Sequence, residues 1–229
     1  MGTALRVATL AWDDARGRVT MNDHTPFQHA LAGGDLVDAI ACGAVGLDGD
    51  RVVEGAATAG IPADATDAVG RVVADVRKRK RPRKARDVVS TLAGQKRQAR
   101  AIDDLVAAGV LVPRPRRFWV VELAPSHHLT DPEDVAAQRA HLGEVLRGHV
   151  PATGLDDRTL AAVALLAPTS LVSCLIGRAS RAERKAARER AHDLVEDPAV
   201  GIAVKQAIEA AEAAIAAVVI GAGAAASSG

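Results

Sequence analysis

Residues 159–177, TLAAVALLAPTSLVSCLIG, are the longest stretch of this chain without a charged side chain. Their length of 19 residues approaches that of a transmembrane helix. Pro168 and the polar residues beside it interrupt the stretch, however, and no aromatic belt of the kind found at membrane interfaces flanks it. We therefore expect one buried central helix, around which the amphipathic segments of the chain pack.

The composition favours a mainly α-helical domain with short surface β-hairpins. Of the 229 residues, 48% are hydrophobic and 25% are charged, which is typical of a globular protein. Aromatic residues make up only 2% and tyrosine is absent, so Ala, Leu, Val and Ile must fill the core. Ala-rich apolar stretches favour helices over strands. We expect a single domain over residues 1–220 and a flexible tail over residues 221–229.

Several absences narrow the class of protein. Cys42 and Cys174 are far apart in apolar surroundings, which predicts free thiols and a cytoplasmic location rather than a disulfide framework. The N-terminus lacks the basic segment and apolar run of a secretory signal. The only histidine cluster, His127-His128, has no further ligand at metal spacing, so we expect no metal and no cofactor. Common catalytic motifs are absent, so we expect no enzyme.

Local patterns predict the elements that flank the central stretch. Apolar spacing over residues 25–42 predicts a helix, and its Gly33-Gly34 pair indicates close packing, because mid-helix glycines cost about 1 kcal/mol each. Asp48-Gly49-Asp50 lies between two apolar runs and predicts the turn of a β-hairpin. Further helices are expected at residues 67–77, 132–148, 180–195 and 198–220, the last with Glu209 and Glu212 facing outward.

Residues 87–123 predict two helices followed by a strand, a turn and a second strand. The strands are VLV and FWVVEL, and the proline- and arginine-rich residues 113–117 are expected to form the turn between them. Residues 124–134 are expected to form a loop. The order of helices and hairpin is the outline of a winged helix, whose second helix and wing bind nucleic acid.

Positive charge is concentrated in the middle of the chain. The formal charge is +1 overall, but it is −6 over residues 1–70, +11 over 71–120 and −4 over 121–229. Residues 77–86, RKRKRPRKAR, hold eight of these cations, either as a solvated connector or as a polyanion contact. A segment this basic attracts nucleic acid, anionic lipid headgroups or an acidic protein, and its charge alone does not choose among them.

Five stretches, in order, resemble the Golgi phosphoprotein 3 family. They are ATLAWDDARGRV, ALAGGDLVDAIACGAVGLDGDRVV, AIDDLVAAGVLVPRPRRFWVVELAPSHHLTD, LDDRTLAAVALLAPTSLVSCLI and ERKAARERAHDLVEDPAVGIAVKQAIEAAEAAIAAVV. The resemblance implies a mostly helical domain around residues 159–177 and no catalysis. It also implies binding of phosphatidylinositol 4-phosphate at membrane surfaces, contacts with glycosyltransferase tails as an adaptor, and a hairpin that serves membrane contact and self-association. The matching hairpin is residues 110–123.

The lipid pocket of the family is altered in this sequence. The family has a Trp before the helix that contains Gly-Gly, an Arg directly before Gly-Gly, and two basic residues on the helix before the hairpin. Here residues 23–27 contain no Trp, Ala32 precedes Gly33, and Gln95 and Gln98 occupy the two later positions. The neighbouring Lys96, Arg97 and Arg100 could supply a substitute anion site.

The leading hypothesis is a peripheral membrane protein that binds anionic, phosphoinositide-type headgroups and acts as an adaptor. The residues expected to bind lipid are Lys96, Arg97, Arg100, Arg114, Arg116 and Arg117, with Phe118 and Trp119 as the membrane-contact residues of the hairpin. The alternative is nucleic-acid binding through the winged-helix outline. A third hypothesis is an interaction protein that forms a homo-oligomer through the 110–123 hairpin or the last two helices.

Overall fold

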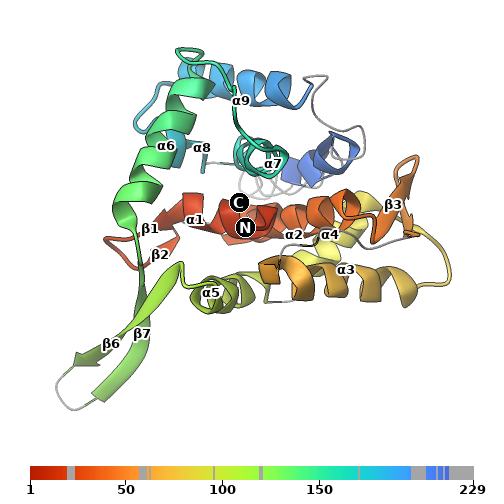
Figure 1. Cartoon of the computed structure of the whole chain (residues 1–229), viewed down its shortest axis with the longest axis horizontal. Coiled ribbons are helices and arrows are strands. Elements are labelled where there is room, and N and C mark those ends of the chain that lie inside the picture. The colour runs from red at the N-terminus through yellow and green to blue at the C-terminus, as the bar shows by residue number, and fades with distance from the viewer. Residues whose placement is uncertain are drawn as a thin grey trace, which may run out of the picture.

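The computed structural model describes residues 1–19, 24–56, 61, 63–94, 96–118, 121–169, 171–196, 205–209, 211–213 and 215–216. The fold is mainly α-helical with short antiparallel strand pairs, as the composition predicts (Figure 1). The helices are α1 (Thr3–Ala11), α2 (His24–Ala41), α3 (Thr66–Arg77), α4 (Ala85–Ala93), α5 (Arg97–Ala107), α6 (Pro132–Leu146), α7 (Asp157–Leu166), α8 (Val172–Ile176) and α9 (Arg181–Val195), with a short 3-10 turn at Ala63–Ala65.

Helix α2 lies at the centre, in contact with α1, α3, α4, α5 and α7. Its two adjacent glycines make this possible. A Cβ on Gly34 would lie 2.7 Å from the backbone nitrogen of Ala4, and a Cβ on Gly33 would lie 2.8 Å from Cβ of Ala211. The prediction that the glycine pair serves close helix packing is confirmed.

The apolar stretch forms two helices instead of the single helix expected. Helix α7 ends at Leu166 and α8 begins at Val172. Pro168 has no N–H to donate, and the Thr169 hydroxyl donates to the Leu166 carbonyl at 2.7 Å and accepts from the Leu171 N–H at 3.0 Å. Residues 159–166 are buried, which confirms the predicted burial. The predicted continuity is corrected, and so is the central position, which α2 occupies. Among the described residues, no helix is long and apolar enough to cross a membrane.

The described residues form three small sheets. They are β1 (Trp12–Asp13) with β2 (Arg18–Val19), β3 (Val45–Asp48) with β4 (Arg51–Glu54) and β5 (Arg83–Lys84), and β6 (Leu111–Phe118) with β7 (Val121–Leu129). The predicted turn between β3 and β4 is confirmed, with Gly49 at a φ of +58°.

The β6–β7 hairpin is longer than the sequence indicated. Residues 113–117 were expected to form its turn, but they belong to strand β6, where Pro113 pairs with His127. The register shifts between Arg114 and Arg116, and such a bulge accommodates Pro115, which cannot donate to the ladder. Residues 124–129, expected in a loop, form the half of β7 that lies nearer to the body of the protein.

The C-terminal half follows most of its predicted boundaries. Helix α6 has Asp131 as its N-cap, and α9 begins with a capping box of Ser180 and Glu183. The described residues between 205 and 216 are helical, as expected. Glu212 is half-buried instead of facing outward, whereas Glu209 is exposed. The tail predicted at 221–229 lies outside the described residues.

Candidate anion-binding and membrane-contact surface

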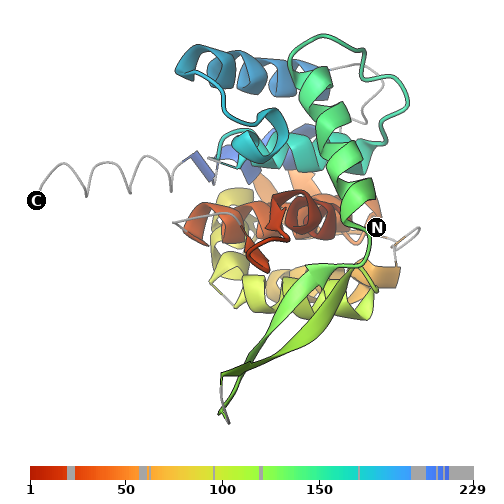
Figure 2. The same cartoon turned by 90° about the vertical axis from the view of Figure 1, so that its left-hand side faces the viewer.

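Helices α3 and α5 form one side of the molecule, and the β6–β7 hairpin extends from the end of that side (Figures 1 and 2). Both helices pack against α2. Gly109, at a φ of +72°, ends α5 and lets the chain turn directly into the hairpin. The Thr130 hydroxyl donates to the Gly109 carbonyl at 2.6 Å, which closes the base of the hairpin.

Arg97 lies inside the protein. Its guanidinium donates to both carboxylate oxygens of Asp35, at 2.6 and 2.8 Å, and to Asp104 at 3.5 Å. The side chains of Arg97 and Asp35 are each only 2% exposed. A buried charge is tolerated when it is paired and hydrogen-bonded in this way. Arg97 is therefore a structural residue that joins α5 to α2, and we leave it out of the proposed lipid-binding residues.

Arg71 and Arg100 lie beside this buried pair. Burial lowers the pKa of the Arg71 guanidinium, and the positive charges of Arg97 and Arg100 lower it further, against the opposing effect of Asp35 and Asp104. Within the described residues, Nη2 of Arg71 is buried without a hydrogen-bond partner. Asp67 also lies close enough to Asp104 to raise the pKa of that carboxyl, so three carboxylates face the three cations.

Sequence reasoning did not single out Arg71 or the Asp35–Arg97 pair. A signal for the pair was present, because Asp35 directly follows the glycines of a helix that was expected to be buried. A carboxylate in that position requires a cationic partner from another element. The sequence did not reveal which of the fifteen cations in residues 71–120 would provide it.

The positions that correspond to the lipid pocket of the family offer no cation among the described residues. Ala32 is fully buried in α2, and Gln98 is half-buried on α5. Gln95 and Asp23 lie outside the described residues, whereas Phe27 is buried near the start of α2. Lys96, exposed in a left-handed conformation at a φ of 56°, and the half-buried Arg100 are the nearest predicted cations.

The hairpin carries the remaining predicted residues. Arg114 is exposed on β6, and Val112 beside it is 46% exposed. Arg116, Arg117 and Phe118 lie on β6 opposite Leu123, Glu122 and Val121, and only their backbone is described. Trp119 lies outside the described residues. The arginines therefore occupy a strand that leads to the turn rather than the turn itself.

Contacts with the N-terminal segment fix the hairpin at its base. A carboxylate oxygen of Asp14 accepts the Leu129 N–H at 2.6 Å and lies 3.6 Å from Nδ1 of His128. The ring of His127 meets the buried Trp12 edge to face at 6.4 Å. The two adjacent histidines therefore anchor the hairpin. No group of three potential metal ligands occurs in the part of the chain that the structure describes.

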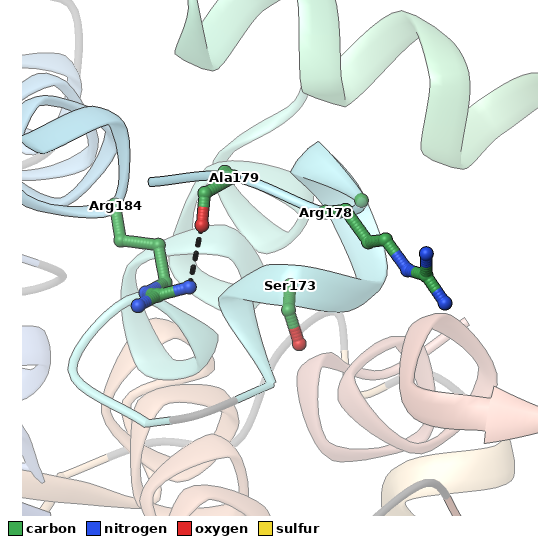
Figure 3. Close-up of a pocket in the computed structure, with 5 residues that line it drawn as sticks. Ser173, Arg178, Ala179 and Arg184 are labelled. Atoms are coloured by element: carbon green, nitrogen blue, oxygen red, sulfur yellow. Dashed lines mark hydrogen bonds between the residues drawn. The ribbon is translucent and has the colours of Figure 1, made fainter. Parts of the chain in front are cut away.

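A basic hollow lies between α8 and α9 (Figure 3), which are on the side of the molecule opposite α3 and α5 (Figure 1). Ser173, Arg178 and Arg184 contribute to its lining, and its volume is about 650 Å³. Arg184 donates to the Ala179 carbonyl at 2.6 Å, while Arg178 points away from Arg184 (Figure 3). Because the two guanidinium groups diverge, this hollow is not a convergent anion site.

A comparison with models of protein families found that residues 5–211 match the model of Golgi phosphoprotein 3 (GPP34). The chain belongs to the Golgi phosphoprotein 3 family. The match spans α1 to the described part of the last helix, and it confirms the resemblance seen in the five sequence stretches. A search of curated proteins found no match. At the level of the Golgi phosphoprotein 3 family, membership fits a non-enzymatic, lipid-binding adaptor.

Proposed function

We propose that this protein is a peripheral membrane protein that binds anionic phospholipids through the start of α5 and the β6–β7 hairpin. The observation that carries the proposal is the hairpin itself, which extends beyond the helices and places a basic strand away from the body (Figure 2). The proposed contact residues are Lys96, Arg100, Arg114, Arg116 and Arg117, with Phe118 and Trp119 entering the interface.

The charge of this surface supports reversible attachment. A basic residue near an anionic membrane contributes about 1 kcal/mol, so five such residues provide a few kcal/mol. Tryptophan and other aromatic side chains favour the headgroup region, where an apolar ring and a polar environment meet. Asp14 and Trp12 anchor the base of the hairpin to the body of the protein. A hairpin that binds the membrane therefore holds the whole protein there.

We infer that charge rather than headgroup identity governs this binding. Ala32 and Gln98 replace the arginine or lysine that a selective phosphoinositide pocket requires in the family, and Arg97 is engaged by Asp35. Arg71 and Arg100 lie partly inside the protein, where the carboxylates of Asp35 and Asp104 act on Arg71. A phosphoinositide should therefore bind in proportion to its charge.

Vesicle co-sedimentation tests the proposal. Wild-type protein is mixed with vesicles of phosphatidylcholine alone, with added phosphatidylserine, or with phosphatidylinositol 4-phosphate at equal total charge. We expect equal binding to the two anionic compositions, with strong weakening by salt. Absence of binding to every anionic vesicle at low salt would overturn the proposal, and strong preference for the phosphoinositide would overturn its charge-only mechanism.

Nucleic-acid binding, the alternative, has less support from the geometry. The predicted order of α4, α5 and hairpin is present. However, α5 packs against α1 and α2, and its Arg97 faces Asp35 instead of a groove. A recognition helix needs a free face whose side chains reach base edges.

Homo-oligomerisation through the hairpin remains a separate proposal, which light scattering of wild type and a Phe118→Ser, Trp119→Ser variant would test.

A further inference from the structure

Four consecutive cations, Lys78, Arg79, Lys80 and Arg81, form an exposed loop between α3 and β5. We call these four residues the basic loop. In the described part of the chain, none of their side chains takes part in an ion pair, although the flanking cations do. The basic loop is therefore the part of the basic run 77–86 whose positive charge no described carboxylate balances.

The cations that flank the basic loop form ion pairs with the nearest acidic groups. Arg77 pairs with Glu54 at 2.5 Å on the side of α3. Arg83 lies 3.5 Å from the buried carboxylate of Asp75, and Lys84 lies 2.7 Å from Asp50. Asp87 at the start of α4 lies 3.7 Å from Arg86. The neighbouring carboxylates thus hold the two ends of the loop and leave its four central charges free to attract an anion.

The backbone at the C-terminal end of the basic loop is also held in place. Strand β5 pairs with β4, with Arg51 opposite Lys84. Nη1 of Arg51 donates to the Pro82 carbonyl at 2.7 Å, and the Ala85 N–H donates to the Asp50 carbonyl at 2.9 Å. A loop fixed in this way loses little further conformational freedom when it binds, which favours affinity. Residues 82–85, which follow the basic loop, are therefore held against β4 and the turn before it.

We propose that the basic loop is a second contact with the anionic phospholipid surface, separate from the hairpin. This inference rests on the proposed function. The loop follows the C-terminal end of α3, whereas the hairpin leaves from α5, so the two cationic groups lie at opposite ends of the side formed by these helices (Figure 1). Contact at both ends would hold α3 and α5 close to the membrane and fix the orientation of the protein on it.

A lipid surface fits the loop better than a nucleic acid does. Residues 77–86 contain no aromatic side chain on which a base could stack, and the loop presents no helix to a groove. The loop therefore recognises negative charge only, which a membrane provides as a continuous surface. A sequence-specific nucleic-acid site would need additional groups that reach base edges.

Two triple variants with equal loss of charge test the proposal. The first is Lys78→Gln, Arg79→Gln, Lys80→Gln, and the control, on the side of α8 and α9, is Arg178→Gln, Arg181→Gln, Lys185→Gln. All six side chains are exposed, so we expect unchanged thermal melting. Binding to phosphatidylserine-containing vesicles should weaken at least about tenfold in the first variant. It should weaken less than about threefold in the control, because only charges close to the membrane surface contribute fully to binding.

The outcomes separate this proposal from the proposed function. If wild type binds anionic vesicles and the loop variant binds equally well, the basic loop is not a contact, while the proposed function stands. If both triple variants weaken binding equally, net charge explains the effect and the loop proposal is overturned. If wild type fails to bind any anionic vesicle, the proposed function fails first. The choice of lipid would be overturned if wild type bound a random-sequence DNA duplex more tightly than vesicles and the loop variant lost this preference.

Discussion

Replacement of Arg97 by methionine distinguishes a structural role of this residue from a lipid-binding one. The substitution keeps much of the side-chain volume but leaves the carboxylate of Asp35 without its partner, at a position that is 2% exposed. Removal of one member of a buried ion pair costs about 3–5 kcal/mol, since the remaining charge stays desolvated. In a protein of this size, that loss corresponds to a fall in melting temperature on the order of 10 °C.

The assay combines thermal melting with vesicle binding. We expect Arg97→Met to melt at a markedly lower temperature, and Arg97→Met combined with Asp35→Leu to recover most of the loss, because the buried carboxylate of Asp35 is removed together with its partner. Arg100→Gln is the matched control, with near-normal melting expected. The reasoning would be refuted if Arg97→Met melted like wild type and yet, well below its melting temperature, lost its binding to anionic vesicles.

Three further changes address the packing of the core and its dependence on pH. Gly34→Ala should lower the free energy of unfolding by about 2 kcal/mol or more in a denaturant titration, because the new Cβ would lie 2.7 Å from the backbone of Ala4; an unchanged midpoint would contradict this. Arg139→Met should also destabilise, since the guanidinium of Arg139 on α6 donates to the carbonyls of Thr9 and Leu10 at the end of α1, at 2.9 and 3.0 Å; hydrogen exchange in α1 should rise selectively, and uniform protection would argue against it. Burial raises the pKa of Glu212 from 4.5 to about 7, so its contribution to stability is full below pH 4.5 and is lost as the pH rises through about 7. Glu212→Gln should therefore match wild type at low pH and exceed it by up to about 3 kcal/mol above pH 7, and a constant difference at all pH values would refute the assignment.

Local sequence signals predicted those elements whose structure depends mainly on nearby residues. Asp131 and Ser180 begin helices because their side chains accept backbone N–H groups three residues later. Gly49 permits the turn between β3 and β4, and the Gly33-Gly34 pair already indicated an unusually close approach. The family resemblance was also readable from the order of the matching stretches, which the family match over residues 5–211 confirms.

Features that depend on distant partners were not predictable in the same way. Pro113 and Pro115 are typical of turns, yet strand β7 and a bulge place them in a strand. Thr169 interrupts the apolar stretch through bonds to its own backbone neighbours. Arg97 has the same local character as Lys96 and Arg100, and only Asp35, 62 residues earlier, makes it structural.

The most direct test of membrane binding through the hairpin is co-sedimentation with phosphatidylserine-containing vesicles, wild type against an Arg114→Ala, Arg116→Ala, Arg117→Ala variant, at low and physiological salt. We predict salt-sensitive binding by wild type and a loss of at least about tenfold in the variant, whose fold thermal melting would verify. Equal binding by the two proteins would contradict the central role of the hairpin.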